Sequence, residues 1–448
     1  MAADQNNPAT VSTEDSFVTS GDGGNGGLLS ALVGSPDRYL WSLLGLLMSV
    51  TVFEAYDVTI FHLCTPDIAR TFHLDDHSVG RMASFVRFGG MLAFFVVALS
   101  DRIGRKPIVS ATVLLYAFFT FLTAISRGLW SFTLCQACAQ IFLSAEFAVA
   151  IIMISEEFVD SARGRGVAML HMVGLLGVVA GGELYGYMAD SRFGWRGMYF
   201  IGIVPLLLVA VMRRNLRETR RFVRLEAEAA PRESFDPLGT IANALAAFRG
   251  VYRRRLLLIA TLWNSVGLVG APAVTFFSLY AKRDRHWTSP QIGHAIVIAY
   301  LLGTLGHAAT GWMLDRFGRR PTACLTYVVG AFSIFALFQT TSHGAMTLAF
   351  CMTVFAFQGS RTATATYSAE LFPTEIRASA YGLTVQVFGQ VAGLFTPYIV
   401  GSMSHAVGGL GNAVAIVSVG PLIGALVVLT LAPETRGRSL EDLAIAST

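Results

Sequence analysis

The chain has 448 residues, of which 54% are hydrophobic and only 14% are charged, and its formal net charge is +4. Soluble domains carry about 25% charged residues. The composition therefore excludes an ordinary soluble protein, and long uncharged runs indicate helices that cross a lipid bilayer.

The first 37 residues are polar and contain the run GDGGNGG. We expect a disordered cytoplasmic tail here, because so few apolar side chains cannot offset the entropy lost on ordering. A secretory signal would instead be basic and then apolar.

Twelve apolar segments follow, and most of them approach the ~20 residues that a helix needs to cross the hydrocarbon. We expect them near residues 39–63, 79–99, 107–125, 130–153, 166–188, 197–212, 256–280, 291–313, 321–340, 345–367, 380–402 and 412–432. The prediction is an all-α membrane protein with twelve transmembrane helices. Six helices fall in 38–213 and six in 255–432, with a central cytoplasmic linker at 214–254 and a tail at 433–448.

The basic residues predict the orientation of these helices. Most of the 33 Lys and Arg residues lie at Arg38, in every second loop, in the central linker and in the C-terminal tail. The positive-inside rule therefore predicts that both termini are cytoplasmic. We expect a multi-pass protein of the plasma (inner) membrane.

A charged heptapeptide occurs twice. DRIGRKP begins at Asp101 and DRFGRRP begins at Asp315, a shift of 214 residues. The same shift, without a gap, also brings Glu156, Phe158 and Arg163 of SEEFVDSARGRG onto Glu370, Phe372 and Arg377 of SAELFPTEIRAS. One register that matches two separate motifs indicates that the chain consists of two duplicated halves.

Two six-helix halves joined by a basic linker resemble the major facilitator superfamily of transporters, and D-R-x-G-R-[KR] resembles that family's loop signature. The family's Gly four residues before the Asp is present as Gly311 but is replaced by Val97 in the first half. The resemblance implies two pseudo-symmetric six-helix bundles around a central cavity. It also implies that these loops form a latch, which holds the cytoplasmic side shut when the cavity faces out; the alternative is that they only anchor the orientation. The latch candidates are Asp101, Arg102, Gly104, Arg105, Asp315, Arg316, Gly318, Arg319, Glu156, Arg163, Glu370 and Arg377.

Charged side chains inside the predicted helices are the candidate functional residues, because each costs at least about 2.5–3.5 kcal/mol in the membrane. Glu54 and Asp57 are one helical turn apart in FEAYDVTIF. Two close carboxylates resist ionising together, so one of them can carry a proton. The EAYD stretch resembles EWYD of metabolite:proton symporters and DGYD of aromatic-acid:proton symporters. The alternative is a structural ion pair with Arg87.

Glu146 and Arg361 lie within the fourth and tenth predicted helices. In the superfamily, equivalent helices of the two halves face each other across the cavity, so the resemblance implies that these two side chains can approach. Arg361 is the candidate ligand of a substrate anion, through its planar fork of donors. Glu146 is then its counter-ion or a proton-coupling residue, and a permanent Arg–Glu bridge is the alternative. Further substrate-binding candidates are Arg87, Tyr56, Asn264, Gln358 and Gln386.

These features favour a secondary active transporter that moves a small organic anion by alternating access, coupled to H+. A sugar or polyol carrier is the alternative, because PETRGRSLEDL and ELFPTEIRASAYG resemble sugar porters. A drug exporter and a non-transporting membrane sensor also remain open. We find no phosphate-binding Gly loop, metal cluster or Ser-His-Asp pattern, and we expect no enzyme activity, no cofactor, no metal and no nucleic acid. The expected partners are a small-molecule substrate, H+ and the lipid bilayer, and we expect a monomer.

Overall fold

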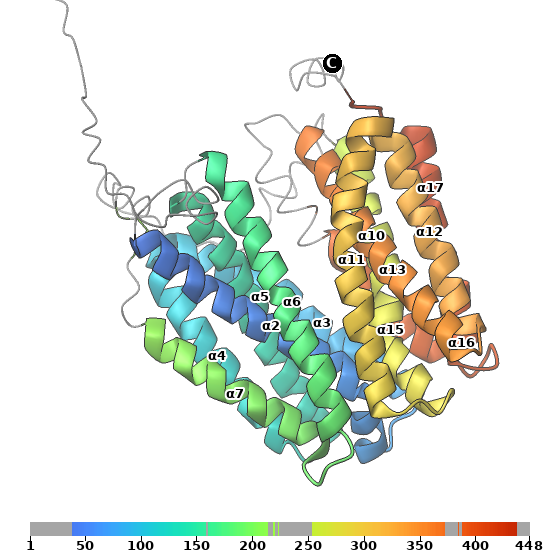
Figure 1. Ribbon diagram of the computed structural model, residues 1–448, viewed down its shortest axis with the longest axis horizontal. Helices are drawn as coiled ribbons and strands as arrows, with labels where there is room; N and C mark the ends of the chain where they lie inside the picture. Colours follow the sequence, from blue (N-terminus) through green and yellow to red (C-terminus); the bar gives the residue numbers. More distant parts are fainter. Residues whose placement is uncertain are drawn as a thin grey trace, which may run out of the picture.

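The structure is a computed structural model that describes residues 38–157, 160–213, 218, 219, 223, 253–371, 384 and 388–436. The described elements are helices arranged in two bundles (Figure 1). The first bundle comprises α2 (Arg38–Phe72), α3 (Asp76–Ile103), α4 (Arg105–Ile125), α5 (Leu129–Glu157), α6 (Asp160–Met188) and α7 (Gly194–Met212). The second comprises α10 (Arg253–Arg283), α11 (Ser289–Phe317), α12 (Arg319–Gln339), α13 (His343–Glu370), the short 3-10 helix η4 (Phe388–Gln390), α15 (Val391–Met403), α16 (Leu410–Val417) and α17 (Gly420–Leu431).

The helices suit a bilayer in length and in surface. Within the described residues, nine spans are long and apolar enough to cross a membrane, and α6, α13 and α15 complete the set of twelve. Large apolar side chains are exposed on the outside of the bundles, among them Leu114, Phe118, Val204, Phe332 and Leu348. Water would penalise such a surface, whereas lipid does not. The predicted twelve-helix membrane fold is confirmed.

The duplication is visible in the backbone. The helices α4 and α12 have the same bounds after a shift of 214 residues. Each begins directly after a glycine with a positive φ, 106° at Gly104 and 104° at Gly318. A side chain is strained in that region, so glycine lets two helices meet with no loop between them.

Two of the differences from the expected segments involve a proline. The first helix was expected to end near residue 63 but continues to Phe72 through Pro66. Proline lacks an N–H, so the carbonyl of His62, four residues earlier, loses its helical partner. The hydroxyl of Ser278 in α10 donates to that carbonyl instead. The segment expected at 412–432 is broken into α16 and α17, because the proline ring of Pro421 allows only the first turn of a new helix there.

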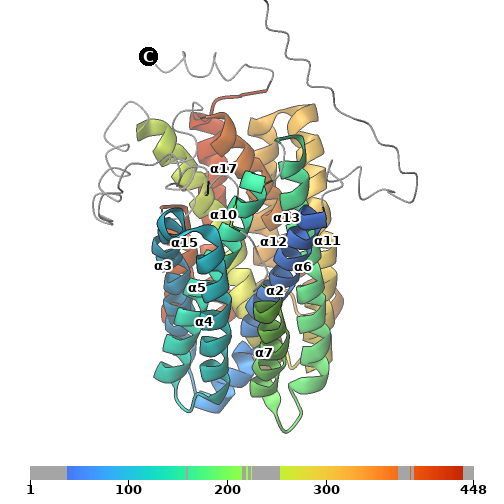
Figure 2. The same cartoon turned by 90° about the vertical axis from the view of Figure 1, so that its left-hand side faces the viewer.

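The two bundles contact each other over part of their length. The helix α2 packs on α10, α3 on α15 and α6 on α11. Figure 1 shows these pairs close at the lower end and the bundles diverging toward the upper end, where α17 ends. Figure 2 shows that α2 also begins toward this upper side. The halves therefore meet on the side opposite to the ends of the described chain.

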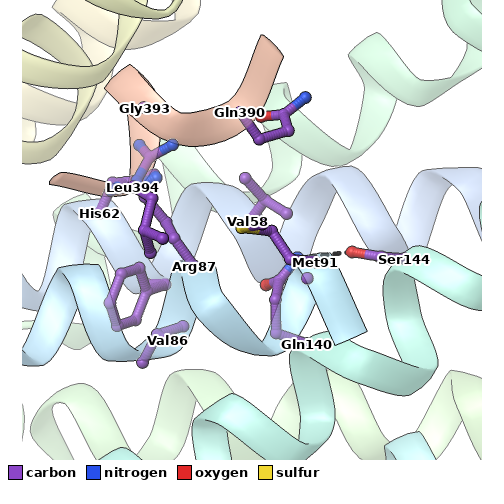
Figure 3. A pocket seen from close by; sticks show the side chains of 12 residues that line it. Val58, His62, Val86, Arg87, Met91, Gln140, Ser144, Gln390, Gly393 and Leu394 are labelled. Atoms are coloured by element: carbon purple, nitrogen blue, oxygen red, sulfur yellow. Dashed lines mark hydrogen bonds between the residues drawn. The ribbon is translucent and has the colours of Figure 1, made fainter. Parts of the chain in front are cut away.

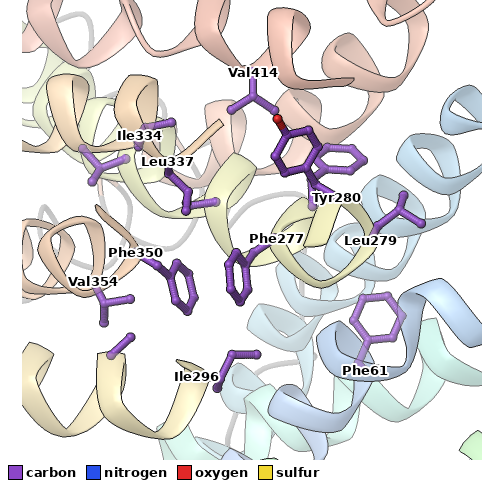
Figure 4. Packing of buried hydrophobic residues seen from close by; sticks show 14 of the residues in the cluster. Phe61, Phe277, Leu279, Tyr280, Ile296, Ile334, Leu337, Phe350, Val354 and Val414 are labelled. Carbon is purple, nitrogen blue, oxygen red and sulfur yellow. The ribbon is translucent and has the colours of Figure 1, made fainter. Parts of the chain in front are cut away.

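Close backbone approach and apolar packing hold that side together. A Cβ atom at Gly293 of α11 would lie 2.2 Å from the carbonyl oxygen of Gly182 in α6, so only glycine permits this contact. Phe277 stacks on Phe350 with 4.0 Å between the ring centres. Phe61 of α2 belongs to the same buried cluster, which thus crosses from one bundle to the other (Figure 4).

Candidate functional site

A cavity of about 220 Å³ lies between the two bundles. Its walls come from α2, α3 and α5 of the first bundle and from η4 and α15 of the second (Figure 3). Arg87 and His62 line it from α3 and α2. Gln140 and Ser144 of α5 lie away from them in this view, with Val58 and Met91 nearby. The cavity therefore combines a basic group, neutral hydrogen-bonding groups and apolar surface.

Among the described residues that line this cavity, Arg87 is the charged one. Its guanidinium donates one hydrogen bond, from NH2 to Oγ1 of Thr275 in α10, at 3.2 Å. Its Nε is buried and has no hydrogen-bond partner. Among the described residues no carboxylate is paired with Arg87, so the ion pair considered for it with Glu54 or Asp57 is not formed. The site thus holds a cation whose charge is not compensated by any carboxylate in the part of the chain that the structure describes.

Arg361, the other expected anion ligand, lies on α13 and does not line this cavity. Its guanidinium carbon lies 5.7 Å from the ring centre of Phe357. Both Arg361 and Arg87 lie near the hydroxyl of Tyr300. Arg361 therefore lies in the neighbourhood of the cavity rather than in its wall.

Glu146 is paired with a residue that the sequence did not suggest. Its carboxylate lies 2.5 Å from NH1 of Arg213, at the end of α7, and accepts a hydrogen bond of 2.5 Å from Thr112. Both charged side chains are 1% exposed. The approach of Glu146 to Arg361 does not occur in this conformation, because Arg213 already neutralises the carboxylate inside the first bundle.

Glu54 and Asp57 have no cationic partner among the described residues. Asp57 is 3% exposed and accepts hydrogen bonds from the side chains of Tyr116 and Gln136. Glu54 is partly buried and lies close enough to Glu146 for their charges to interact. Asp57 thus faces α4 and α5, and the carboxylate that interacts with Glu54 is Glu146 of α5.

The remaining substrate candidates have other surroundings. The hydroxyl of Tyr56 donates to the carbonyl of Met198 in α7 at 2.8 Å, inside the first bundle. Asn264 donates to the carbonyl of Phe388 at 2.7 Å and accepts from the N–H of Ala392 at 2.6 Å, which fixes the turn between η4 and α15. Gln358 lies on α13 with its Oε1 buried and without a partner. None of these three lines the cavity, and Gln386 lies outside the described residues.

The first charged heptapeptide is bound within its own bundle. Arg105 donates from NH2 to Glu156 at 2.8 Å and from NH1 to the carbonyl of Ser100 at 3.0 Å. The carboxylate of Glu218 accepts hydrogen bonds from the N–H groups of Arg105 and Lys106, at 3.0 and 3.1 Å. These are the first two N–H groups of α4, where the helix dipole favours a negative charge.

The second heptapeptide repeats this arrangement. Arg319 donates to Glu370 at 2.8 Å and to the carbonyl of Leu314 at 3.0 Å. Glu434 accepts from the N–H groups of Arg319 and Arg320, at 2.9 and 3.0 Å. Burial alone would raise the pKa of Glu434, but the N–H groups that it accepts from hold this pKa below its ordinary value.

The other latch candidates are more exposed or lie outside the described residues. Asp315 is 82% exposed and lies 3.4 Å from Arg319, and Arg316 is exposed in the last turn of α11. Arg102 lies in the last turn of α3. The side chains of Asp101 and Arg163 and the whole of Arg377 are outside the described residues. No described contact of the heptapeptides reaches the opposite bundle.

On the opposite side, ion pairs join the two bundles. Nζ of Lys282 in α10 lies 3.0 Å from the carboxylate of Asp67 in α2 and donates to Ser289 at 2.9 Å. The hydroxyl of Tyr185 in α6 donates to the same carboxylate at 2.8 Å. Arg283 pairs with Asp76 of α3. These residues form what we call the inter-bundle gate, defined by Asp67, Asp76, Tyr185, Lys282 and Arg283.

Sequence reasoning missed the gate, Arg213 and the two capping glutamates. A signal for the glutamates was present, because RETR at 217–220 and PETR at 433–436 occur after equivalent helices. The gate residues lie at helix ends, where charges are usual and do not stand out. Among the described residues no group of three His, Cys, Asp or Glu side chains could hold a metal ion, and the five cysteines are unpaired.

Comparison with curated proteins gives relatives of nearly the full length. A metabolite transport protein of Haemophilus influenzae is 26% identical over 398 residues, covering 87% of this chain and 95% of that protein. The niacin transporter NiaP of Acinetobacter baylyi is 24% identical and covers 91% and 97%. The 4-hydroxybenzoate transporter PcaK of Pseudomonas aeruginosa is 24% identical and covers 79% and 85%.

Comparison with solved structures supports the fold. The crystal structure of a D-xylose-proton symporter matches with a TM-score of 0.74 at 18% sequence identity. The match covers 90% of this chain and 100% of the symporter. At this level of sequence identity, the similarity is evidence for the fold but not for the substrate.

The family model described as Major Facilitator Superfamily matches residues 47–397 and 265–445, which together include both bundles. Its members and the named relatives are transporters, so this chain is an integral multi-pass transporter and not an enzyme. The chain belongs to the Major Facilitator Superfamily.

Proposed function

We propose that this chain moves a small organic anion across the membrane by alternating access, coupled to protons, with Arg87 as the residue that binds the anion. The observation that carries the proposal is the guanidinium of Arg87, which lines a cavity between the bundles without a carboxylate partner among the described residues. An uncompensated cation at this depth is costly unless a ligand supplies the counter-charge.

The size of the cavity and the names of the relatives agree with this substrate class. A cavity of about 150 Å³ accommodates benzene, so about 220 Å³ suits a substituted single ring or a short carboxylate. Two of the relatives are named for niacin and for 4-hydroxybenzoate, both of which are carboxylic acids on one ring.

Glu54 and Asp57 are the proposed proton carriers. Both lack a cationic partner among the described residues, whereas Glu146 is neutralised by Arg213. A carboxylate that is buried without a cation exchanges its proton at a lower cost than one held in an ion pair. We therefore assign Glu146 a structural role and leave coupling to the pair on α2.

The conformation fits one end state of a transport cycle. With cytoplasmic termini, as the basic residues predict, the inter-bundle gate closes the outer side and the bundles diverge toward the cytoplasm. The heptapeptides then belong to the open side, each bound within its own bundle. Movement to the outward-facing state would break the gate and bring the two heptapeptides toward the opposite bundle.

A neutral sugar is the second candidate substrate, favoured by the amides and hydroxyl of Gln140, Gln390 and Ser144 in the cavity wall. It would leave Arg87 without a counter-charge. The two candidates therefore differ in whether binding needs this guanidinium.

The test is ligand-induced thermal stabilisation of the purified full chain, with nicotinate, 4-hydroxybenzoate and xylose as probes. We expect the carboxylates to raise the melting temperature. Arg87→Lys and Arg87→Met should each lower carboxylate affinity about tenfold or more, because a charged hydrogen bond is lost or misplaced. Arg81→Lys, an exposed position on the same helix, is the matched control. Binding of xylose alone, or equal carboxylate binding by the Arg87 variants, would contradict the proposal.

A further inference from the structure

His62 lines the same cavity as Arg87 (Figure 3) and has not been assigned a role. The residue is 8% exposed, and its Nδ1 is buried without a hydrogen-bond partner. Leaving such a group unpaired costs about 1–3 kcal/mol, so native proteins rarely do so without a reason. The Nε of Arg87 is unpaired in the same way. Two residues that line one small space, from two helices, thus each carry an unsatisfied polar group.

The position of His62 is fixed by the backbone. Pro66 frees the carbonyl of His62 from the helical pattern, and Ser278 of α10 donates to that carbonyl. The ring of Phe61 contacts the imidazole edge-to-face, with 5.2 Å between the ring centres. His62 is therefore held in place at the seam between the bundles.

Arg87 is held to the same helix of the second bundle. Its guanidinium donates to Thr275, one turn before Ser278 in α10. His62 and Arg87 are thus tied to consecutive turns of α10. A ligand that contacts them lies where the bundles must separate during a transport cycle.

The two side chains offer complementary hydrogen bonds. Arg87 is the charged group that faces His62 among the described residues. A neutral imidazole carries one N–H donor and one acceptor, whereas a guanidinium carries only donors. A carboxylate has about four lone-pair sites on two oxygens, so it can accept from both residues together.

We propose that His62 and Arg87 form a two-residue carboxylate clamp, in which the guanidinium carries the charge and the imidazole N–H binds the carboxylate from a second direction. This inference rests on the proposed function and deepens it, because it makes His62 a determinant of specificity. A primary amide of the same shape offers only one acceptor oxygen and places an N–H₂ against a donor. The clamp therefore selects carboxylates over the corresponding amides.

The experiment compares thermal stability and carboxylate affinity, which a substitution of His62 should change in opposite directions. His62→Leu removes an unsatisfied polar group, so the unliganded full chain in detergent should melt at the same or a higher temperature. The same variant should bind nicotinate and 4-hydroxybenzoate about tenfold more weakly, because one hydrogen bond to a charged group is lost. His62→Gln keeps an N–H donor and should retain most of the affinity.

Two controls separate the possible failures. His405→Leu changes an exposed histidine outside the cavity and should alter neither property. The wild-type chain should bind nicotinamide more weakly than nicotinate. In the His62→Leu protein, the difference between the affinities for these two ligands should be smaller. If wild type binds the carboxylates and His62→Leu binds them equally well, the clamp is refuted while the anion site at Arg87 stands. If wild type binds no carboxylate, both the proposed function and the clamp are refuted.

Discussion

The ionisable side chains in the interior differ in whether other residues neutralise their charge and complete their hydrogen bonds. Glu146 has a cation, Arg213, and a hydroxyl, Thr112. Asp57 has two neutral donors, and Arg87 has one neutral acceptor. A fully paired charge is costly to disturb and contributes mainly to structure, whereas an unpaired one can exchange a proton or bind a counter-ion. This contrast is the basis for the proposed roles: a structural pair, two proton carriers and an anion ligand.

The structural role of Glu146 predicts a specific pattern of rescue. Glu146→Gln leaves Arg213 buried and unpaired, so it should lower the free energy of unfolding by about 3–5 kcal/mol. Replacing both residues by methionine should restore most of this loss, since two apolar side chains need no partner. Thermal melting of the purified variants measures the effect.

Transport by the double variant tests the role directly. Because Glu54 and Asp57 are the proposed carriers, the Glu146→Met, Arg213→Met protein should keep proton-driven uptake. If the double variant is stable but its uptake no longer depends on a pH gradient, Glu146 takes part in proton coupling and the structural role is wrong.

The sequence indicated which charged side chains lie inside the bundles, but not their partners. Hydropathy alone identified Glu54, Asp57, Arg87 and Glu146, because a charge within an apolar run is conspicuous. Arg213 was not among the candidates, since its burial depends on how the end of α7 lies against α4 and α5. His62 was not distinguished from other histidines, because the absence of a hydrogen-bond partner is a property of the folded structure.

At the scale of helices, the same contacts occur twice. The carboxylates of Glu218 and Glu434 each cap the first N–H groups of α4 and α12. The heptapeptide repeat predicted equivalent loops, and the common bounds of α4 and α12 agree with it. The repeat did not predict the length of α2 or the break before α17, because the first depends on contacts with α10 and the second on one proline.

The inter-bundle gate yields a prediction about helix separation. Lys282→Met should weaken the contact of α10 with α2 and α6, because it leaves the buried carboxylate of Asp67 without its partner from α10. Cys64, fully buried one turn before Asp67, is a native reporter of this opening. In a background with the other four cysteines replaced by alanine, maleimide should label Cys64 several-fold faster in the Lys282→Met protein.

A neighbouring ion pair supplies the control. Arg70 also lies 3.2 Å from Asp67, but its side chain is 74% exposed. Exposed ion pairs contribute about 0–1 kcal/mol, so Arg70→Met should leave the labelling rate nearly unchanged. Equal rates in Lys282→Met and wild type would show that the gate does not hold this side closed.

At the scale of the molecule, two bundles meet on one side and diverge on the other, with the cavity at their seam. The composition and the internal repeat predicted two six-helix halves. They could not predict which side is closed, because both end states use the same sequence and differ only in which contacts between the bundles are formed. The gate residues and the cavity could therefore be identified only from the structure.

The most direct test of the central claim is uptake of labelled nicotinate into proteoliposomes under an imposed pH gradient, beside protein-free liposomes. Proteoliposomes with the wild-type chain should accumulate nicotinate toward the alkaline side faster than protein-free liposomes. Those with the Arg87→Met protein should match the protein-free rate. Uptake that is equal in wild type and Arg87→Met, or that never exceeds the protein-free rate for nicotinate and 4-hydroxybenzoate alike, would contradict the account.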